Sequence, residues 1–142
     1  MADGEVVTDR EHTSHAVASV LVTTADGRIL LARNKQGWGT VGGHIDPGDA
    51  SIPAAAAREA LEEIGLVLAE SHLVPLAFLA DEAEIRPGHA HLDFCYLHRV
   101  VEPVGVVPSS DVTEAAWFSF EDLPEINPHI SALVAAAARW AG

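Results

Sequence analysis

The sequence predicts an α/β fold in which a mixed sheet lies between two helices. Short β-branched and apolar runs alternate with turn residues, an amphipathic helix is predicted mid-chain, and an alanine-rich helix is predicted near the C-terminus. The chain has 142 residues, 49% of them hydrophobic, and a mean hydropathy of +0.18. This length and composition suit one folded domain. We expect a flexible arm over residues 1–13 and a single domain over residues 14–142.

The strands are predicted from enrichment in β-branched and apolar residues between turn signals. Residues 16–24 form the first strand, Asp26-Gly27 is typical of a hairpin turn, and residues 29–32 return beside it. The later strands are predicted over residues 73–85, 89–101 and 115–120, with a turn at Arg86-Pro87-Gly88 and a loop over residues 108–113.

The first helix is predicted over residues 54–64 by its apolar spacing. An apolar stripe at i, i+3, i+4 and i+7 is formed by Ala57, Ala60, Leu61 and Ile64. The charged residues Arg58, Glu59, Glu62 and Glu63 fall on the other side. The last helix, over residues 128–140, has its own stripe of Ile130, Leu133, Val134, Ala137 and Trp140.

The glutamates of the first helix indicate a metal site. Glu59 faces both Glu62 and Glu63, and like charges at these spacings cost roughly 0.2–0.5 kcal/mol per pair. A solvated helix face is the ordinary explanation of such a run. A bound divalent cation is the alternative, because hard cations such as Mg²⁺ prefer carboxylate oxygens and bridge to phosphates.

The segment from Gly43 to Leu66 resembles the Nudix box, the signature of the Nudix hydrolases. Its second half matches in register, with Arg58-Glu59, Glu62-Glu63 and Gly65-Leu66. Its first half departs from the pattern, because Asp49 stands in place of Glu and one extra residue precedes Arg58. We expect the insertion to bulge the loop and leave the spacing of the glutamates unchanged. The resemblance implies an α/β/α sandwich with a mixed, curved sheet.

The resemblance also implies the roles of the box residues. Glu59, Glu62 and Glu63 would be catalytic residues that bind Mg²⁺ or Mn²⁺, helped by the Gly42 carbonyl, with Glu59 as one candidate for the general base. Arg58 would orient these groups by pairing with Glu62 and reaching back toward the loop. The substrate would be contacted by Gly43 and Asp49.

Four positions downstream of the box are further candidates. Relatives often place an acidic residue before a Trp-Phe strand, where this chain has Asp111 and Glu114. We favour Glu114 for the metal site and retain Asp111 as a substrate contact.

The motif His89-x-His91-x-Asp93 places three polar side chains on one face of a strand. His91 and Asp93 are therefore candidates for lining the substrate pocket, although a polar sheet face would give the same pattern.

Together these features predict a metal-dependent hydrolase that cleaves a diphosphate linkage in a nucleoside diphosphate derivative. Asp81 and Glu82 replace the proline and tyrosine expected in two other subfamilies, which favours a MutT-like pyrophosphohydrolase acting on nucleoside triphosphates or related nucleotides. A Nudix-fold module that binds nucleotides without hydrolysing them is the alternative.

The composition of the chain limits which classes of partner and which cell compartment we expect. The net charge of −13 argues against a nucleic-acid polymer, because phosphate backbones require Lys and Arg. Without a signal pattern or a long apolar run, we expect no membrane association and a cytoplasmic protein. Cys95, the one cysteine, is expected in the core, and the apolar strands would permit a homodimer.

Overall fold

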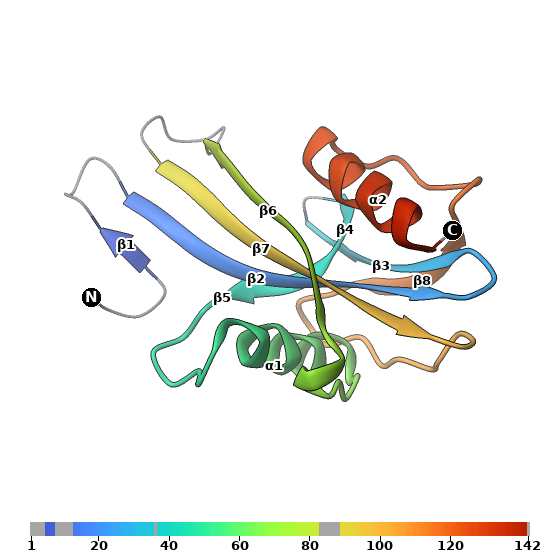
Figure 1. Cartoon of the computed structure of the whole chain (residues 1–142), viewed down its shortest axis with the longest axis horizontal. Helices are drawn as coiled ribbons and strands as arrows, with labels where there is room; N and C mark the ends of the chain where they lie inside the picture. Colours follow the sequence, from blue (N-terminus) through green and yellow to red (C-terminus); the bar gives the residue numbers. More distant parts are fainter. Residues whose placement is uncertain (1–4, 8–12, 36, 83–88, 142) are drawn as a thin grey trace.

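The computed structural model describes residues 5–7, 13–35, 37–82 and 89–141 and forms a mixed sheet with a helix on each face (Figure 1). Helix α1 is Ile52–Ile64 and helix α2 is Pro128–Ala141. The predicted α/β sandwich is therefore confirmed. Neither helix has the length and apolar character that crossing a membrane requires, within the part of the chain described.

The sheet contains eight strands among the described residues. They are β1 (Glu5–Val7), β2 (Thr13–Thr24), β3 (Arg28–Asn34), β4 (Gly37–Gly39), β5 (Val41–His44), β6 (Val74–Glu82), β7 (His89–Val100) and β8 (Glu114–Ser119), and a 3₁₀ turn, η1 (Glu70–His72), precedes β6. The predicted strands all appear within a few residues of their expected bounds. The short strands β4 and β5, in the glycine-rich segment, and β1, within the predicted arm, were not expected. The predicted turn at residues 86–88 lies outside the described residues.

Strand β2 organises the sheet because it has a different set of partners on each edge. On one edge it pairs in parallel with β7, from Thr13 opposite His89 to Thr24 opposite Val100. On the other edge it pairs in turn with β1, β5 and β3, all antiparallel. Strand β6 extends the sheet beyond β7, while β4 and β8 pair with β3. This arrangement places the glycines of β5 beside the middle of the sheet.

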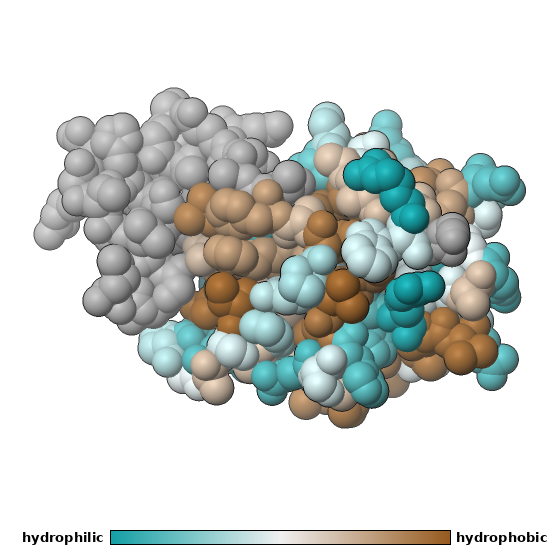
Figure 2. Space-filling model, viewed as in Figure 1, coloured by the Kyte–Doolittle hydropathy of each residue, from teal (hydrophilic) through white to brown (hydrophobic). Residues whose placement is uncertain are grey.

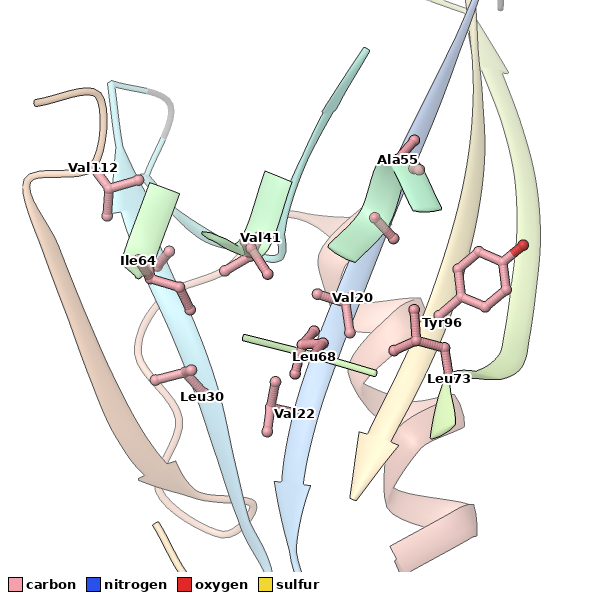
Figure 3. Packing of buried hydrophobic residues seen from close by; sticks show 14 residues of the cluster. Val20, Val22, Leu30, Val41, Ala55, Ile64, Leu68, Leu73, Tyr96 and Val112 are labelled. Carbon is pink, nitrogen blue, oxygen red and sulfur yellow. The ribbon is translucent and has the colours of Figure 1, made fainter. Parts of the chain in front are cut away.

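The sheet separates two hydrophobic clusters, and alternation along β2 assigns its residues to them. Val20 and Val22 lie in the cluster beneath α1, which Figure 3 shows together with Ile64. Leu21 lies in the cluster beneath α2, with Cys95 and Leu133. Cys95 is only 1% exposed, and burial raises the pKa of its thiol to about 12, so the expected core position is confirmed.

Helix α1 is rotated about its axis relative to the predicted stripe. Its buried residues are Ala55, Ala56, Ala60 and Ile64, whereas Leu61 is 53% exposed. The placement of Leu61 in the apolar stripe was therefore wrong. The reason is that Glu59 and Glu63 turn toward β5, which moves the buried face by about one residue.

The same departure from the predicted stripe occurs at the end of α2. Ile130, Leu133, Val134 and Ala137 are buried as predicted, but Trp140 is half exposed. Trp140 lies in the last turn, where the helix has passed the residues of the cluster beneath it.

An apolar surface lies beside the grey residues in Figure 2, over the region that β6 and β7 cross in Figure 1. The half-exposed Phe78 of β6 packs on Phe94 of β7, with ring centroids 4.6 Å apart. The expectation of a homodimer stays a prediction.

Candidate active site

Arg58 connects the residues of the candidate site. Its Nε and Nη2 donate to the two oxygens of Asp49, at 2.8 and 3.1 Å. Its Nη1 donates to Glu59 and to Glu62, at 3.0 Å each, and Nη2 also donates to the His44 carbonyl at 3.1 Å. The pairing with Glu62 and the reach toward the loop follow the sequence prediction. One guanidinium therefore fixes the loop and two helix carboxylates relative to one another.

Asp49 is the partner that holds Arg58 in place. Its side chain is 6% exposed, and its Oδ2 also accepts a hydrogen bond from the Asp46 amide at 2.7 Å. The Arg58 guanidinium is the main reason that the pKa of Asp49 lies below its ordinary value. These contacts orient Arg58, whereas the predicted contact of Asp49 with substrate stays a prediction.

The one-residue insertion before Arg58 does not interrupt the helix. The Ser51 side chain caps α1 by accepting from the Ala54 amide at 3.1 Å, and Pro53 lies in the first turn. The helix then continues unbroken to Ile64 and ends at Gly65, which has φ of 66°. The box glutamates therefore keep the i, i+3 and i+4 spacing that the sequence predicts.

Glu59 lies against the backbone of β5. A Cβ on Gly43 would be 2.6 Å from the Glu59 carboxyl carbon, so any larger residue there would require the Glu59 side chain to move. The Glu59 side chain is 13% exposed. Its pKa is raised mainly by this burial, against the lowering effect of Arg58. Glu59 is therefore a partly desolvated carboxylate held at the sheet edge.

Glu63 reaches the same edge one turn later. Its Oε1 accepts a hydrogen bond from the Gly42 amide at 3.1 Å. Burial is the main cause that raises its pKa to about 7; the Gly42 bond opposes this shift, and the negative charges of Glu59 and Asp111 add to it. A carboxyl group with this pKa is one that a nearby cation would strongly favour in its charged form.

The Gly42 backbone faces away from β2 and toward these carboxylates. In an antiparallel pair the amide and carbonyl of one residue point to the same edge, and alternate residues bond to the partner strand. Gly42 lies opposite Ser19, and its amide donates to Glu63 rather than to β2. The Gly42 carbonyl therefore points to the outer edge of β5 as well, which suits the predicted role of a metal ligand.

The donors gathered at this edge fit a hard divalent cation in their chemistry. Glu59, Glu62, Glu63 and the Gly42 carbonyl offer only oxygen atoms, and Gly43 lets the Glu59 carboxylate lie against the β5 backbone. Over the described residues, no three His, Cys, Asp or Glu side chains already form a metal-holding cluster. Arg58 holds Glu59 and Glu62, and the Gly42 amide holds Glu63, so an ion would have to replace or share these partners. Their role as metal ligands stays a prediction.

The two downstream acidic candidates lie in different surroundings. The loop before β8 is fixed to the end of α1, because the Ser109 amide donates to the Glu63 carbonyl at 2.7 Å. Asp111, in this loop, is close enough for its charge to raise the pKa of Glu63. Glu114 instead begins β8 and pairs with Arg33 at 3.7 Å. The structure thus brings Asp111 to the helix glutamates and Glu114 to Arg33.

Asp93 lies on the other face of the sheet from the α1 glutamates, and it is 5% exposed. It accepts a hydrogen bond from the Ser19 hydroxyl at 2.8 Å, and its other oxygen lies 3.0 Å from His129 Nε2. Asp93 also lines a pocket, and its predicted contact with the substrate stays a prediction. His91 lies in β7, but its side chain and that of His89 are outside the described residues.

Sequence reasoning missed Ser19 and His129 as partners of Asp93. They come from β2 and from the first turn of α2, and neither stands in a motif. Only the register of β2 against β7, and the position of α2 on the sheet, bring them together.

A family model described as the NUDIX domain matches residues 13–137 of the chain. A comparison with curated proteins finds no significant match.

Three solved structures illustrate the similarity of fold. A MutT NUDIX hydrolase from Burkholderia pseudomallei is 23% identical, with 87% of this chain and 97% of that chain covered and a TM-score of 0.72. An Ap4A hydrolase from C. elegans, solved as a binary complex, is 22% identical, with 89% and 96% covered and a TM-score of 0.72. The NUDIX domain of Shewanella oneidensis NrtR, complexed with ADP ribose, is 15% identical, with 89% and 88% covered and a TM-score of 0.72. At these identities the likeness concerns the fold.

Proposed function

The chain belongs to the NUDIX domain family and is a hydrolase of pyrophosphate bonds, and we propose that it acts on a nucleoside triphosphate or a related nucleotide with the help of Mg²⁺ or Mn²⁺. The observation that carries this proposal is the group of carboxylates around Gly42 and Gly43, which Arg58 and the β5 backbone hold in place. The NrtR domain, solved with ADP ribose, supports a nucleotide derivative as the substrate class.

Glu59, Glu62, Glu63 and the Gly42 carbonyl would hold the cation. When bound, a divalent ion neutralises phosphate charge and lowers the pKa of a water molecule. These ligands would come from one helix and from the strand beside it. The net charge of −13 makes such neutralisation necessary for a polyanionic substrate to approach.

Glu59 is the residue we propose as general base. Its carboxylate would accept a proton from the water that attacks phosphorus, and the bond from phosphorus to the bridging oxygen would break as the new bond forms. Burial raises the pKa of Glu59, which makes its carboxylate a stronger base than an exposed glutamate. Arg58 and Asp49 would act as positioning residues, since Asp49 holds Arg58 and Arg58 donates to Glu59.

Substitution of Glu62 tests the proposal without disturbing the fold. The Glu62 side chain is 57% exposed and its ion pair with Arg58 is a surface contact, so Glu62→Gln should change stability by less than about 1 kcal/mol. We expect turnover to fall by orders of magnitude, roughly 100-fold or more, because a metal ligand is lost. Glu121→Gln, which removes an exposed glutamate elsewhere, is the matched control.

The assay is phosphate release from NTPs and dNTPs with inorganic pyrophosphatase added, and from ADP-ribose and nucleotide sugars with a phosphatase added to release phosphate from the monophosphate products. Each compound is measured with Mg²⁺, with Mn²⁺ and with EDTA. Hydrolysis that EDTA abolishes supports the proposed metal dependence, and the preferred compound identifies the substrate. Full activity of Glu62→Gln would place the metal site elsewhere. Tight nucleotide binding without any turnover would support the binding module instead.

A further inference from the structure

Three histidines share one face of the sheet at the left-hand ends of β2 and β7 in Figure 1. His89 and His91 are alternate residues of β7, and His15 of β2 lies opposite His91 in the parallel pairing. Alternate residues of a strand, and residues opposite each other on neighbouring strands, lie on the same face of a sheet. The backbone register alone therefore brings three of the eight histidines of the chain together, and we call this group the histidine corner.

The histidine corner lies on the face of the sheet on which α2 packs. Two residues after His91, Asp93 lies 3.0 Å from His129 Nε2 in the first turn of α2, and Cys95 belongs to the cluster beneath α2. By alternation His91 lies on this same face, beyond the start of α2, where Figure 1 shows neither α1 nor α2 over the strands. The histidine corner is therefore on the other face of the sheet from the α1 glutamates.

The spacing of these positions suits a single metal ion. Adjacent strands lie about 4.8 Å apart, and alternate residues of one strand lie about 6.6 Å apart. Two histidines one turn apart on a helix, at about 5–6 Å, bind one zinc ion in the H-E-x-x-H motif. The backbone places His91 at a comparable spacing from both His15 and His89.

Two of the three histidines have an acidic residue at the opposite position on their other neighbouring strand. Glu5 of β1 lies opposite His15, and Asp81 of β6 lies opposite His91. A histidine that binds a metal usually donates its second ring N–H to a carboxylate or a carbonyl, which fixes the ring and makes it a better ligand. The register therefore places a residue of the required type beside each of these two histidines.

We propose that His15, His89 and His91 together bind one divalent transition-metal ion. Glu5 and Asp81 act as positioning residues for the imidazoles opposite them. Imidazole suits Zn²⁺, Cu²⁺ and Ni²⁺, whereas Mg²⁺ prefers oxygen ligands. Three histidines with water in the fourth position form a tetrahedral zinc site. The ion links β2 to β7 at strand ends that neither helix covers, and it differs in ligands and in face from the ion proposed at α1.

The first test measures the binding of Zn²⁺ to the unaltered chain by calorimetry. Mg²⁺ is kept in excess so that it occupies the oxygen ligands at α1, and the titration is repeated with Glu62→Gln. We expect one Zn²⁺ per chain to bind in both proteins with the same affinity. Absence of this binding, or its loss in Glu62→Gln, would overturn the proposal. No turnover is measured, so the result stands whether or not the proposed hydrolase activity is found.

The second test replaces the histidines one at a time. We expect His89→Gln and His91→Gln each to weaken Zn²⁺ binding at least about tenfold, because losing even a residue that only orients a ligand costs about 10–100-fold in affinity. His72→Gln removes an exposed histidine of η1 and is the matched control, which should bind Zn²⁺ as the unaltered chain does. Equal affinity of His91→Gln and His72→Gln would contradict the proposal.

The role of Asp81 has its own pair of variants. Asp81→Asn removes the charge opposite His91, and Asp122→Asn makes the same change at an exposed position elsewhere. We expect Zn²⁺ affinity to fall about tenfold in Asp81→Asn and to stay unchanged in Asp122→Asn. Unchanged affinity in both variants would remove Asp81 from the proposed site.

X-ray absorption spectroscopy of the unaltered chain with one equivalent of Zn²⁺ identifies the ligands directly. We expect three imidazole nitrogens at about 2.0–2.1 Å from the ion. Zinc should also raise the midpoint of thermal unfolding, because only the folded register assembles the site. Ligands that are all oxygen atoms would contradict the proposal. This measurement decides the question where a histidine variant loses the native circular dichroism spectrum.

Discussion

At the scale of single residues, the ionised Glu63 carboxylate of the candidate site destabilises the metal-free fold. Its carboxyl group is placed by α1 where burial and the charges of Glu59 and Asp111 disfavour ionisation, and its pKa rises from 4.5 to about 7. A raised carboxyl pKa means that the folded state binds the proton more tightly than the unfolded chain does. The metal-free fold therefore loses stability as the pH rises from about 4.5 to 7.

Replacing Glu63 by glutamine should remove this loss. In EDTA at pH 8, we expect Glu63→Gln to raise the free energy of unfolding by about 1 kcal/mol, after allowance for solvent screening of the charges. Near pH 4 the effect should be much smaller, because the wild-type carboxyl is then protonated. Urea denaturation of both proteins at the two pH values measures the difference. A stabilisation that is the same at both pH values would contradict the explanation by charge burial.

Some contacts of the site were predictable at the scale of residues because they are local. The pairing of Arg58 with Glu62 follows from helical spacing alone. The bond between Asp49 and Arg58 depends on the path of the inserted loop, and the Asp93 cluster depends on how β2, β7 and α2 dock. Such contacts join residues that share no periodic pattern, so the sequence alone did not reveal them.

At the scale of elements, the close approach of β5 to α1 defines the site. Strand β5 was missed because Val41-Gly42-Gly43-His44 has two glycines, which are depleted in strands. Its pairing with β2 supplies the stabilisation that its own sequence lacks. Helix α1 was predictable because it has a side-chain cap at Ser51, a left-handed stop at Gly65 and continuous helix-forming residues between them.

A methyl group on Gly43 should disrupt this approach. In Gly43→Ala the new Cβ would overlap the Glu59 carboxylate, so either Glu59 or β5 must move. We expect kcat to fall at least about tenfold, because a displacement of about 1 Å in a catalytic group is sufficient for a loss of that order. Steady-state kinetics with a metal titration measures the effect. Gly105→Ala is the control, since no heavy atom would lie within 4 Å of its Cβ. Equal kinetics of the two variants would show that Glu59 does not need its present position.

At the scale of the whole molecule, the acidic surface governs encounter with the substrate. The net charge of −13 repels a nucleotide until cations screen it. The layered fold itself was predictable, because two helices and alternating apolar strands leave few other ways to bury both faces of a sheet. The order of the strands was not, because it depends on pairing between distant segments.

Ionic strength should therefore change the rate of encounter. Raising KCl from about 20 to about 200 mM shortens the Debye length from roughly 20 to 7 Å, and we expect kcat/KM for a triphosphate to increase about two- to threefold. Free Mg²⁺ is kept saturating throughout, and kcat at saturating substrate serves as the internal control because it does not depend on encounter. A decrease of kcat/KM with salt would mean that local positive potential, rather than the net charge, steers the substrate.

The parallel pairing of β2 with β7 affects how the chain folds during its synthesis. The two strands join residues separated by more than half of the chain, and parallel pairing of such distant segments folds slowly because a long loop must close first. Strand β2, with α1 and β5 beside it, leaves the ribosome well before β7 is synthesised. Until residue 100 has emerged, the nascent chain therefore carries an apolar strand with one unpaired edge, and such an edge favours aggregation.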